Sequence, residues 1–172
     1  ERGLKLMKDQ LKDKVLMLIA GDARLTAQKI AVMLDADVGH VKEIIEELEE
    51  KGVVVGYKAL VDWDKTDREY VTALIELKVT PQRDRGFERV AERIYNFPEV
   101  RNMYLMSGAY DLCVMIEGKT MKEVALFVAE KLAPIDGVIS TSTHFVLRKY
   151  KDMGVVYGHG TEMTHDERGN MN

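Results

Sequence analysis

The residues best suited to hold a small charged molecule surround a glycine in the second half of the chain. Gly108 allows a positive φ, so a turn there can present main-chain N–H groups to a carboxylate. Asp111 carries an acceptor-only carboxylate at neutral pH that can take an ammonium group, so the two residues could grip both ends of an amino acid. The alternative is a plain hairpin turn in which Asp111 bonds its own backbone. Side chains that could line the pocket are Leu105, Met121 and His144.

A second group of polar residues lies on a predicted helix in the first third of the chain. The stretch 38–51 holds two Lys and five Glu. A helix that docks on DNA approaches phosphates, so each carboxylate costs electrostatic affinity, although a carboxylate can also accept a hydrogen bond from cytosine N4. The positions expected to be exposed, of which the first five are candidate DNA contacts, are Gly39, His40, Lys42, Glu43, Glu46, Glu47, Glu49 and Glu50.

Basic side chains that could neutralise phosphate precede this helix. Thr26 is placed to cap a helix, because its hydroxyl can accept a first-turn N–H, and the N-terminus of that helix can hold a phosphate. The candidate contacts are Arg24, Thr26 and Lys29, with further help from Lys5, Lys8, Lys12 and Lys14. Against this, the net charge is −4, and residues 1–60 hold 10 Lys and Arg against 11 Asp and Glu. Neither half of the chain is a basic module.

The composition is that of a globular protein, and we expect it in the cytoplasm. No run of about eighteen apolar residues is present, so we expect no membrane span, and no basic-then-apolar leader is found. The single cysteine, Cys113, cannot form an internal disulfide, which fits a reducing compartment. Because Cys113 lies within the apolar run 112–116, we expect it in the core rather than as a nucleophile.

The spacing of apolar residues predicts three helices in the first third of the chain. Apolar residues recur at helical intervals within 10–20, 26–34 and 37–52, and Asp37 can cap the third segment. A tight turn joins the second and third helices, which is the helix-turn-helix arrangement, although a plain three-helix bundle has the same periodicity. The segment 53–60 has strand character and could form a wing or a linking strand.

After residue 68 the apolar period changes from helical to alternating. Strands are predicted over 68–79, 101–107, 110–117 and 138–147, with helices over 87–95 and 121–132. This order, strand-helix-strand twice, is that of a ferredoxin-like βαββαβ domain, so the fold class is α+β. Both helices should cover one face of an antiparallel sheet. The other face, with Thr72 and Leu74 or with the alternate set, should be buried against a second copy of the chain.

We therefore expect four parts along the chain. They are a helix-turn-helix domain over 1–55, a linking strand over 56–67, a ferredoxin-like effector-binding and oligomerisation domain over 68–157, and a polar tail over 158–172. The tail is polar and contains glycine, so we expect poor order there. Its weak metal-ligand cluster, interpreted as solvated, consists of His159, Glu162, His165 and Asp166. No metal site and no cofactor are expected.

Several short motifs occur in a fixed order. They are the stretches 22–26, 48–52 running into 55–59, 106–112 and 137–143. Each is common alone, but their order and spacing together resemble the Lrp/AsnC family, also called feast/famine proteins, over roughly residues 8–150.

The resemblance implies a transcription regulator that binds double-stranded DNA as a homodimer or as an octamer built from dimers. It also implies that the C-terminal domain binds an amino acid or a related metabolite, usually between subunits. It places Ser107 and Tyr110, together with Gly108 and Asp111, in the effector-responsive region. Members of the family generally carry Ser, Thr and Arg in the recognition helix, so the acidic stretch 38–51 is a departure from the family pattern.

Two other functions stay open from the sequence. The acidic helix suggests a sensor or partner subunit that has lost DNA binding. Sirohaem decarboxylases also resemble this two-part layout and use His and Arg in the pocket, for which His144, Arg101 and Arg148 are the counterparts here. No Ser/His/Asp set, phosphate loop or metal-ligand spacing stands out elsewhere, so we expect no enzyme activity.

Overall fold

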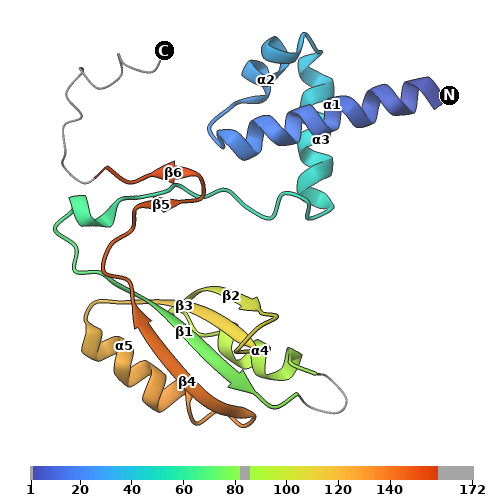
Figure 1. Cartoon of the computed structure of the whole chain (residues 1–172). Helices are drawn as coiled ribbons and strands as arrows, with labels where there is room; N and C mark the ends of the chain where they lie inside the picture. The colour runs from blue at the N-terminus through green and yellow to red at the C-terminus, as the bar shows by residue number, and fades with distance from the viewer. Residues whose placement is uncertain (1, 82–85, 159–172) are drawn as a thin grey trace, which may run out of the picture. The chain divides into compact units, whose positions relative to one another are not determined.

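The computed structural model describes residues 2–81 and 86–158, with side chains from residue 10 onward. The chain divides into two compact units, Glu1–Val61 (unit 1) and Asp62–Asn172 (unit 2). Unit 1 is helical, and unit 2 is built on an antiparallel sheet (Figure 1). Within the described ranges, no helix combines the length and the apolar character that a membrane span requires.

Unit 1 consists of three helices, two of which begin at side-chain caps. α1 spans Arg2–Gly21, α2 spans Ala27–Leu34 and α3 spans Val38–Glu50. Thr26 Oγ1 accepts a hydrogen bond from Lys29 N and so caps α2. Asp37 Oδ1 accepts from His40 N at 2.9 Å and caps α3. The three predicted helices and both predicted caps are confirmed.

One apolar cluster and one ion-paired carboxylate hold these helices together. Lys12 Nζ of α1 lies 2.6 Å from Glu47 Oε1 of α3, and Lys51 contacts the same oxygen. Hydrogen bonds from Lys12, and to a smaller extent from Lys51, lower the pKa of Glu47 to about 2. Glu47 therefore stays ionised through most of the acid range. The buried apolar side chains are Val15, Ile19, Ile30, Ala31, Val41, Ile44 and Leu48.

The segment after α3 contains no strand. The N–H groups of Val53 and Val54 both donate to Leu48 O, at 2.9 and 3.1 Å, and so close the helix. Residues 55–62 have no regular structure, and a short 3-10 turn, η1, spans Trp63–Lys65. The predicted wing over 53–60 and linking strand over 56–67 are therefore wrong for the single chain. A strand needs a hydrogen-bonded neighbour, and no β-pairing in the described residues reaches this segment.

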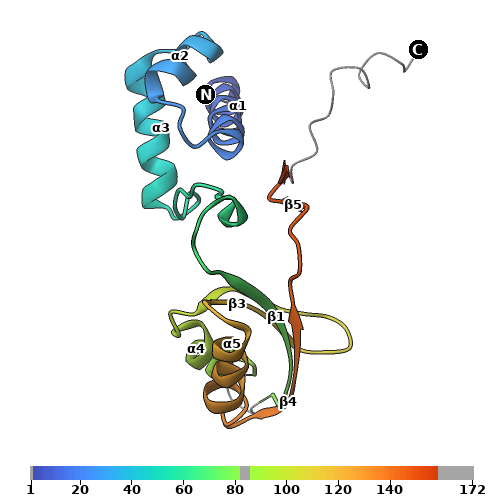
Figure 2. The ribbon, with the colours of Figure 1, turned by 90° about the vertical axis from the view of Figure 1, so that its left-hand side faces the viewer.

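Unit 2 has the predicted ferredoxin-like order of elements. The sheet is antiparallel with strand order β2-β3-β1-β4. Figure 2 shows α4 and α5 on the same side of this sheet. The α+β class and the βαββαβ arrangement are confirmed. The elements are β1 Val71–Val79, α4 Glu88–Tyr95, β2 Val100–Leu105, β3 Leu112–Gly118, α5 Met121–Phe127, its π-helical continuation η2 Val128–Leu132, and β4 Val138–Phe145.

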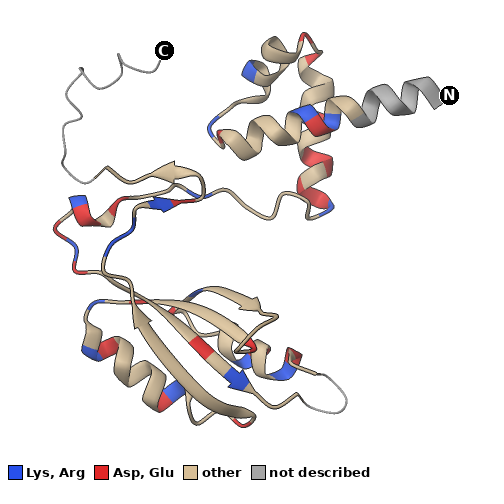
Figure 3. Cartoon of the chain, in the orientation of Figure 1, with Lys and Arg blue, Asp and Glu red and all other residues tan. Residues whose placement is uncertain are grey.

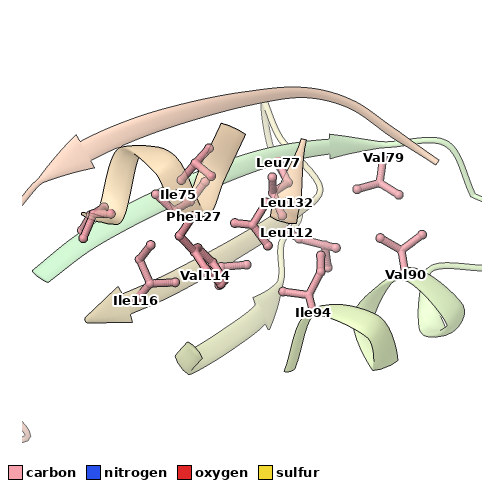
Figure 4. Close-up of a cluster of buried hydrophobic side chains, with 13 residues drawn as sticks. Ile75, Leu77, Val79, Val90, Ile94, Leu112, Val114, Ile116, Phe127 and Leu132 are labelled. Carbon is pink, nitrogen blue, oxygen red and sulfur yellow. The ribbon is translucent and has the colours of Figure 1, made fainter. Parts of the chain in front are cut away.

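The core of unit 2 lies between the sheet and these helices. Alternate residues of β1 and β3 point into it, and apolar residues of α4, α5 and η2 meet them (Figure 4). Each fully buried Leu or Ile side chain contributes about 1.5–3 kcal/mol relative to exposure. The strands supply Ala73, Ile75, Leu77, Val79, Leu112, Val114 and Ile116, and the helical segments supply Val90, Ile94, Val124, Phe127, Val128 and Leu132.

On the other side of the sheet, the uncovered face, no helix of the described residues packs in the single chain. The register places Leu74 beside Met115 and His144, and Glu76 beside Cys113. The uncovered face therefore carries the set that contains Leu74, which is one of the two predicted alternatives. Cys113 is only 6% exposed, but it lies on this face and not in the core under the helices.

A small hairpin near the end of unit 2 was not predicted. β5 spans Lys151–Asp152 and β6 spans Val155–Val156, paired antiparallel. The turn between them has positive φ at Met153 (47°) and Gly154 (84°). Met is an unusual residue at such a position, and strands of two residues show no alternation, so the sequence carries little signal for this element. The candidate metal cluster of the tail, His159 to Asp166, lies outside the described residues.

Replacing Glu47 should change how stability depends on pH. Its pKa in the folded chain, about 2, lies below the ordinary value of 4.5, so it contributes stability that is present above pH 4.5 and is lost as the pH falls towards 2. E47Q should lower the midpoint of thermal unfolding at pH 7 and flatten its decline over that acid range. E50Q, at an exposed position of the same helix, should behave like the wild type. An E47Q curve parallel to the wild-type curve would contradict this expectation.

Candidate nucleic-acid interface and effector site

Three residues join α2 and α3 in a fixed turn. Asp35 ends α2 in the left-handed conformation with φ of 51°, which Asp tolerates better than most residues. Ala36 N donates to Ala31 O at 2.9 Å, and Asp37 then caps α3. Two capped helices joined by a tight turn form the helix-turn-helix arrangement, in which the second helix can enter the major groove.

The outer surface of α3 is rich in carboxylates. Figure 3 shows acidic residues over the second half of this helix. Of the predicted DNA contacts on α3, His40 is half-buried, and its Nδ1 lies 3.5 Å from Glu43 Oε2. The other predicted contacts on the helix are exposed, and these are Gly39, Lys42, Glu43 and Glu46.

Two carboxylates of α3 make contacts within unit 1. Glu47 is held by Lys12, so Lys12 is not available to a phosphate in the way the sequence suggested. Glu49 Oε1 accepts a hydrogen bond from Tyr57 Oη at 2.7 Å, which raises the pKa of Tyr57. Part of the acidic composition of α3 is therefore explained by contacts within the fold rather than by a role in binding.

The basic candidates near the start of α2 are accessible. The Arg24 side chain is 91% exposed, and its Nε lies 3.1 Å from Asp22 Oδ1, a contact that lowers the pKa of Asp22. Lys29 is exposed. Thr26 Oγ1 accepts from Lys29 N, which leaves its hydroxyl proton to donate to a phosphate oxygen. Lys14 is exposed, whereas Lys5 and Lys8 lie outside the described side chains.

The effector candidates surround the loop 106–111, which is longer than predicted. β2 ends at Leu105 and β3 begins at Leu112, so six residues connect the strands instead of the expected pair Gly108–Ala109. Gly108 does not adopt a positive φ, which corrects the expectation for this residue. A longer loop can reverse the chain without a left-handed residue. A Cβ at Gly108 would meet no atom within 4 Å, so this position borders open space.

Asp111 holds the loop against the end of β1. Its N–H donates to Leu77 O at 2.9 Å, and its carbonyl accepts from Met106 N at 2.7 Å. Its carboxylate Oδ2 accepts from Val79 N at 2.8 Å. The pairing of β1 with β3 ends at Leu77 and Leu112, so the Val79 N–H, which lies on the same edge of β1 as Leu77 O, needs an acceptor other than a strand partner. The Asp111 carboxylate thus bonds a neighbouring strand, which neither predicted alternative included.

The remaining effector candidates fall in three places. Leu105 is 61% exposed at the end of β2, next to the loop that carries Ser107. Tyr110 is half-buried and hydrogen-bonds Cys113, whose pKa is raised chiefly by burial. Met121 starts α5 beyond the far end of β3, about 20 Å along the strand from Asp111, so within one chain it does not lie beside the loop.

His144 and the arginines considered for an enzyme pocket do not converge. His144 Nε2 lies 3.6 Å from Glu76 Oε1 on the uncovered face. Arg101 Nε is paired with Glu117 Oε2 at 2.5 Å on β2. Because β2 and β4 are the two edges of the sheet, Arg101 and His144 are separated by about 14 Å of sheet. Arg148 Cζ lies 5.7 Å from the centre of the Tyr150 ring.

A cavity beside α5, lined by charged and apolar residues, was not anticipated. It has a volume of about 240 Å³. Lys131 Nζ lies 2.9 Å from Glu99 Oε1 and balances one of the carboxylates. The polar residues come from separate elements, so no local motif marks the cavity. Its lining consists of Glu99, Ile116, Glu117, Gly118, Glu123, Val124, Leu126, Phe127, Glu130 and Lys131.

Removing the Asp111 carboxylate should destabilise unit 2. D111A leaves the Val79 N–H without its acceptor, which costs about 1–3 kcal/mol of unfolding free energy. D111N keeps an oxygen and should recover part of that loss. The measurement is urea unfolding of each variant, with D136A at an exposed position as the control. Equal midpoints for D111A and D136A would rule out this role.

Comparison with known proteins identifies the family. Residues 72–156 match the family model of the Lrp/AsnC ligand binding domain. The chain is 48% identical to the uncharacterized HTH-type transcriptional regulator YugG of Bacillus subtilis, over 87% of this chain and 90% of that protein. It is 30% identical to the HTH-type transcriptional regulator LrpA of Pyrococcus abyssi, over 81% of this chain and 97% of LrpA.

Solved structures share the fold. Escherichia coli AsnC matches with a TM-score of 0.64 and 18% identity, over 81% of this chain and 92% of AsnC. A Neisseria meningitidis transcriptional regulator solved as an L-Met complex matches with a TM-score of 0.68 and 22% identity, over 83% and 92% of the two chains. Together with the relatives in sequence, the helix-turn-helix of unit 1 and the ferredoxin-like unit 2 show that this chain belongs to the Lrp/AsnC family of HTH-type transcriptional regulators.

Proposed function

We propose that this protein is a cytoplasmic, homodimeric transcription regulator that binds a specific double-stranded DNA site through unit 1 and responds to an amino acid bound by unit 2. The observation that carries the proposal is the presence, in one chain, of a capped helix-turn-helix and a Lrp/AsnC ligand binding domain. The relatives reported above are named as transcriptional regulators, which favours this function over a decarboxylase-like enzyme.

The DNA contact would be made by α3 and the start of α2. Lys42 and Lys29 are exposed and can meet phosphates, and Arg24 lies close to Lys29 in sequence. The carboxylates of α3 reduce the sequence-independent part of the affinity. A dimer that presents two such units compensates, because the second contact is intramolecular.

The effector would bind beside the loop 106–111, with Leu105 and Tyr110 supplying apolar contact. Ser107 and the main-chain N–H groups around Gly108 are hydrogen-bond donors suited to a carboxylate. Asp111 is assigned the role of holding the loop, since its carboxylate already binds Val79 N. The exposure of Leu105 and the open space at Gly108 support a site that a second copy of the chain completes.

The proposed function predicts an amino-acid-dependent interaction with DNA. In a gel shift against the region upstream of the protein's own gene, the wild type should give a sequence-selective complex whose midpoint changes with one amino acid of a panel. L-Met is a suitable first probe, because a protein of the same fold was solved as an L-Met complex. G108Q should keep the shift and lose the response, since it fills space that is open in the chain.

The control for this variant is G21Q, at a second glycine where an added Cβ meets nothing within 4 Å. G21Q should keep the response to the amino acid. A complete absence of selective binding by the wild type, at low and moderate salt, would instead favour the sensor that has lost DNA binding, to which the acidic surface of α3 points.

The proposed dimer uses the uncovered face of the sheet. Leu74 and Met115 are apolar and half-buried there, and Glu76 with Lys78 on β1 offers charges of both signs that a two-fold axis can pair. L74R should convert the dimer to a monomer in size-exclusion chromatography with light scattering. L126R, on α5 at the opposite side of the sheet, should leave the dimer intact. A wild-type monomer, or an L74R dimer, would contradict this assembly.

A further inference from the structure

The surface that α3 turns away from the core is a narrow stripe of carboxylates. Successive helix residues are about 100° apart. Val41, Ile44 and Leu48 are buried, so the opposite side of the helix is centred on residues that lie half a turn from them. These residues form the outward stripe, and all of them are exposed: Gly39, Glu43, Glu46 and Glu50.

The outward stripe is distinct from the acidic residues that serve the fold. Glu47 and Glu49 lie on the flanks and bond Lys12 and Tyr57. The Glu43 side chain is 78% exposed, and only one of its oxygens lies near His40. Among the described residues, no hydrogen bond or ion pair involves Glu46. Two carboxylates in the first nine residues of the helix are therefore presented outward by the fold.

A carboxylate can only accept hydrogen bonds at neutral pH, which restricts the bases it can recognise. In the major groove, guanine presents the acceptors N7 and O6, and thymine presents the acceptor O4. Adenine presents an amino group beside the acceptor N7, which repels the second oxygen of a carboxylate. Cytosine presents only its N4 amino group there, so it is the base that suits a glutamate best.

Resting on the DNA binding proposed above, we propose that Glu43 and Glu46 determine specificity by accepting hydrogen bonds from the N4 amino groups of cytosines at neighbouring base pairs. The two residues are three positions apart on the helix, a rise of about 4.5 Å, which is close to the roughly 3.4 Å between base pairs. Gly39 carries no side chain, so the N-terminal end of the outward stripe can approach the bases closely.

The same carboxylates account for discrimination against other DNA. Their repulsion by phosphate is independent of sequence, whereas their hydrogen bonds form best at cytosine. They therefore weaken every complex and restore affinity only at the correct site, which raises the ratio of specific to non-specific binding. Lys42 and Lys29 supply the phosphate contacts that this arrangement requires.

The test is selection of bound duplexes from a randomised library by the full chain, comparing the wild type with E43Q, E46Q and the control E50Q. Glu50 lies on the same outward stripe but in the last turn of α3. The wild-type motif should contain two adjacent cytosines on one strand of each half-site, and replacing either with thymine should weaken binding roughly 5- to 150-fold.

Each glutamine variant should lose the preference for cytosine at one of the two positions. Because Gln pairs with adenine N6 and N7, E43Q and E46Q should each select adenine there, at different positions, whereas E50Q should keep the wild-type motif. A wild-type motif that E43Q and E46Q leave unchanged, or that lacks the adjacent cytosines, would overturn this inference alone. A wild type that selects no motif would overturn the proposed DNA binding together with it.

Discussion

β1 is hydrogen-bonded on both edges, to β3 and to β4, so its register decides which side chains reach each face of the sheet. Ala73, Ile75 and Leu77 enter the core, and the residues between them form the uncovered face. A slip of one residue would exchange the two sets and expose the apolar one. Asp111 fixes the end of this register on the β3 edge, because it bonds Leu77 O and Val79 N just beyond the last pair of β1 with β3. The loop proposed to bind the effector therefore depends on the central strand.

Features that depend on local residue spacing could be predicted from the sequence. Contacts between residues that are far apart in the chain could not. The alternation of Val71–Val79 and the caps at Thr26 and Asp37 are local signals, and the structure contains the elements that they predict. Asp111 appeared free to bind a ligand, because the need of the Val79 N–H for an acceptor arises only where the pairing of β1 with β3 ends. Met121 appeared to be a pocket wall, because the length of β3 separates it from the loop only once the sheet is formed.

The carboxylates of α3 belong to two groups with different roles, and a count of charges does not separate them. Glu47 lies on the flank of the helix that faces α1, where Lys12 and Lys51 lower its pKa to about 2. Its charge is engaged in contacts within unit 1. Glu43 and Glu46 lie on the outward stripe, where their charge contributes nothing to packing. A basic recognition helix would gain affinity for any DNA sequence, whereas outward carboxylates gain it only at amino groups. A net charge near neutrality in unit 1 is therefore compatible with selective binding.

Because the effector loop is exposed, a single chain can bury only part of the surface of a ligand. Leu105 is 61% exposed and the space at Gly108 is open, so an amino acid held by one chain would keep much of its surface in water. A second copy that covers the loop would bury that surface and gain the corresponding free energy. The ligand would then bind the assembled state more tightly than the separate chains, and linkage requires that it favour assembly to the same degree. Since two units in one assembly bind DNA with higher avidity, such a ligand alters DNA binding without touching α3.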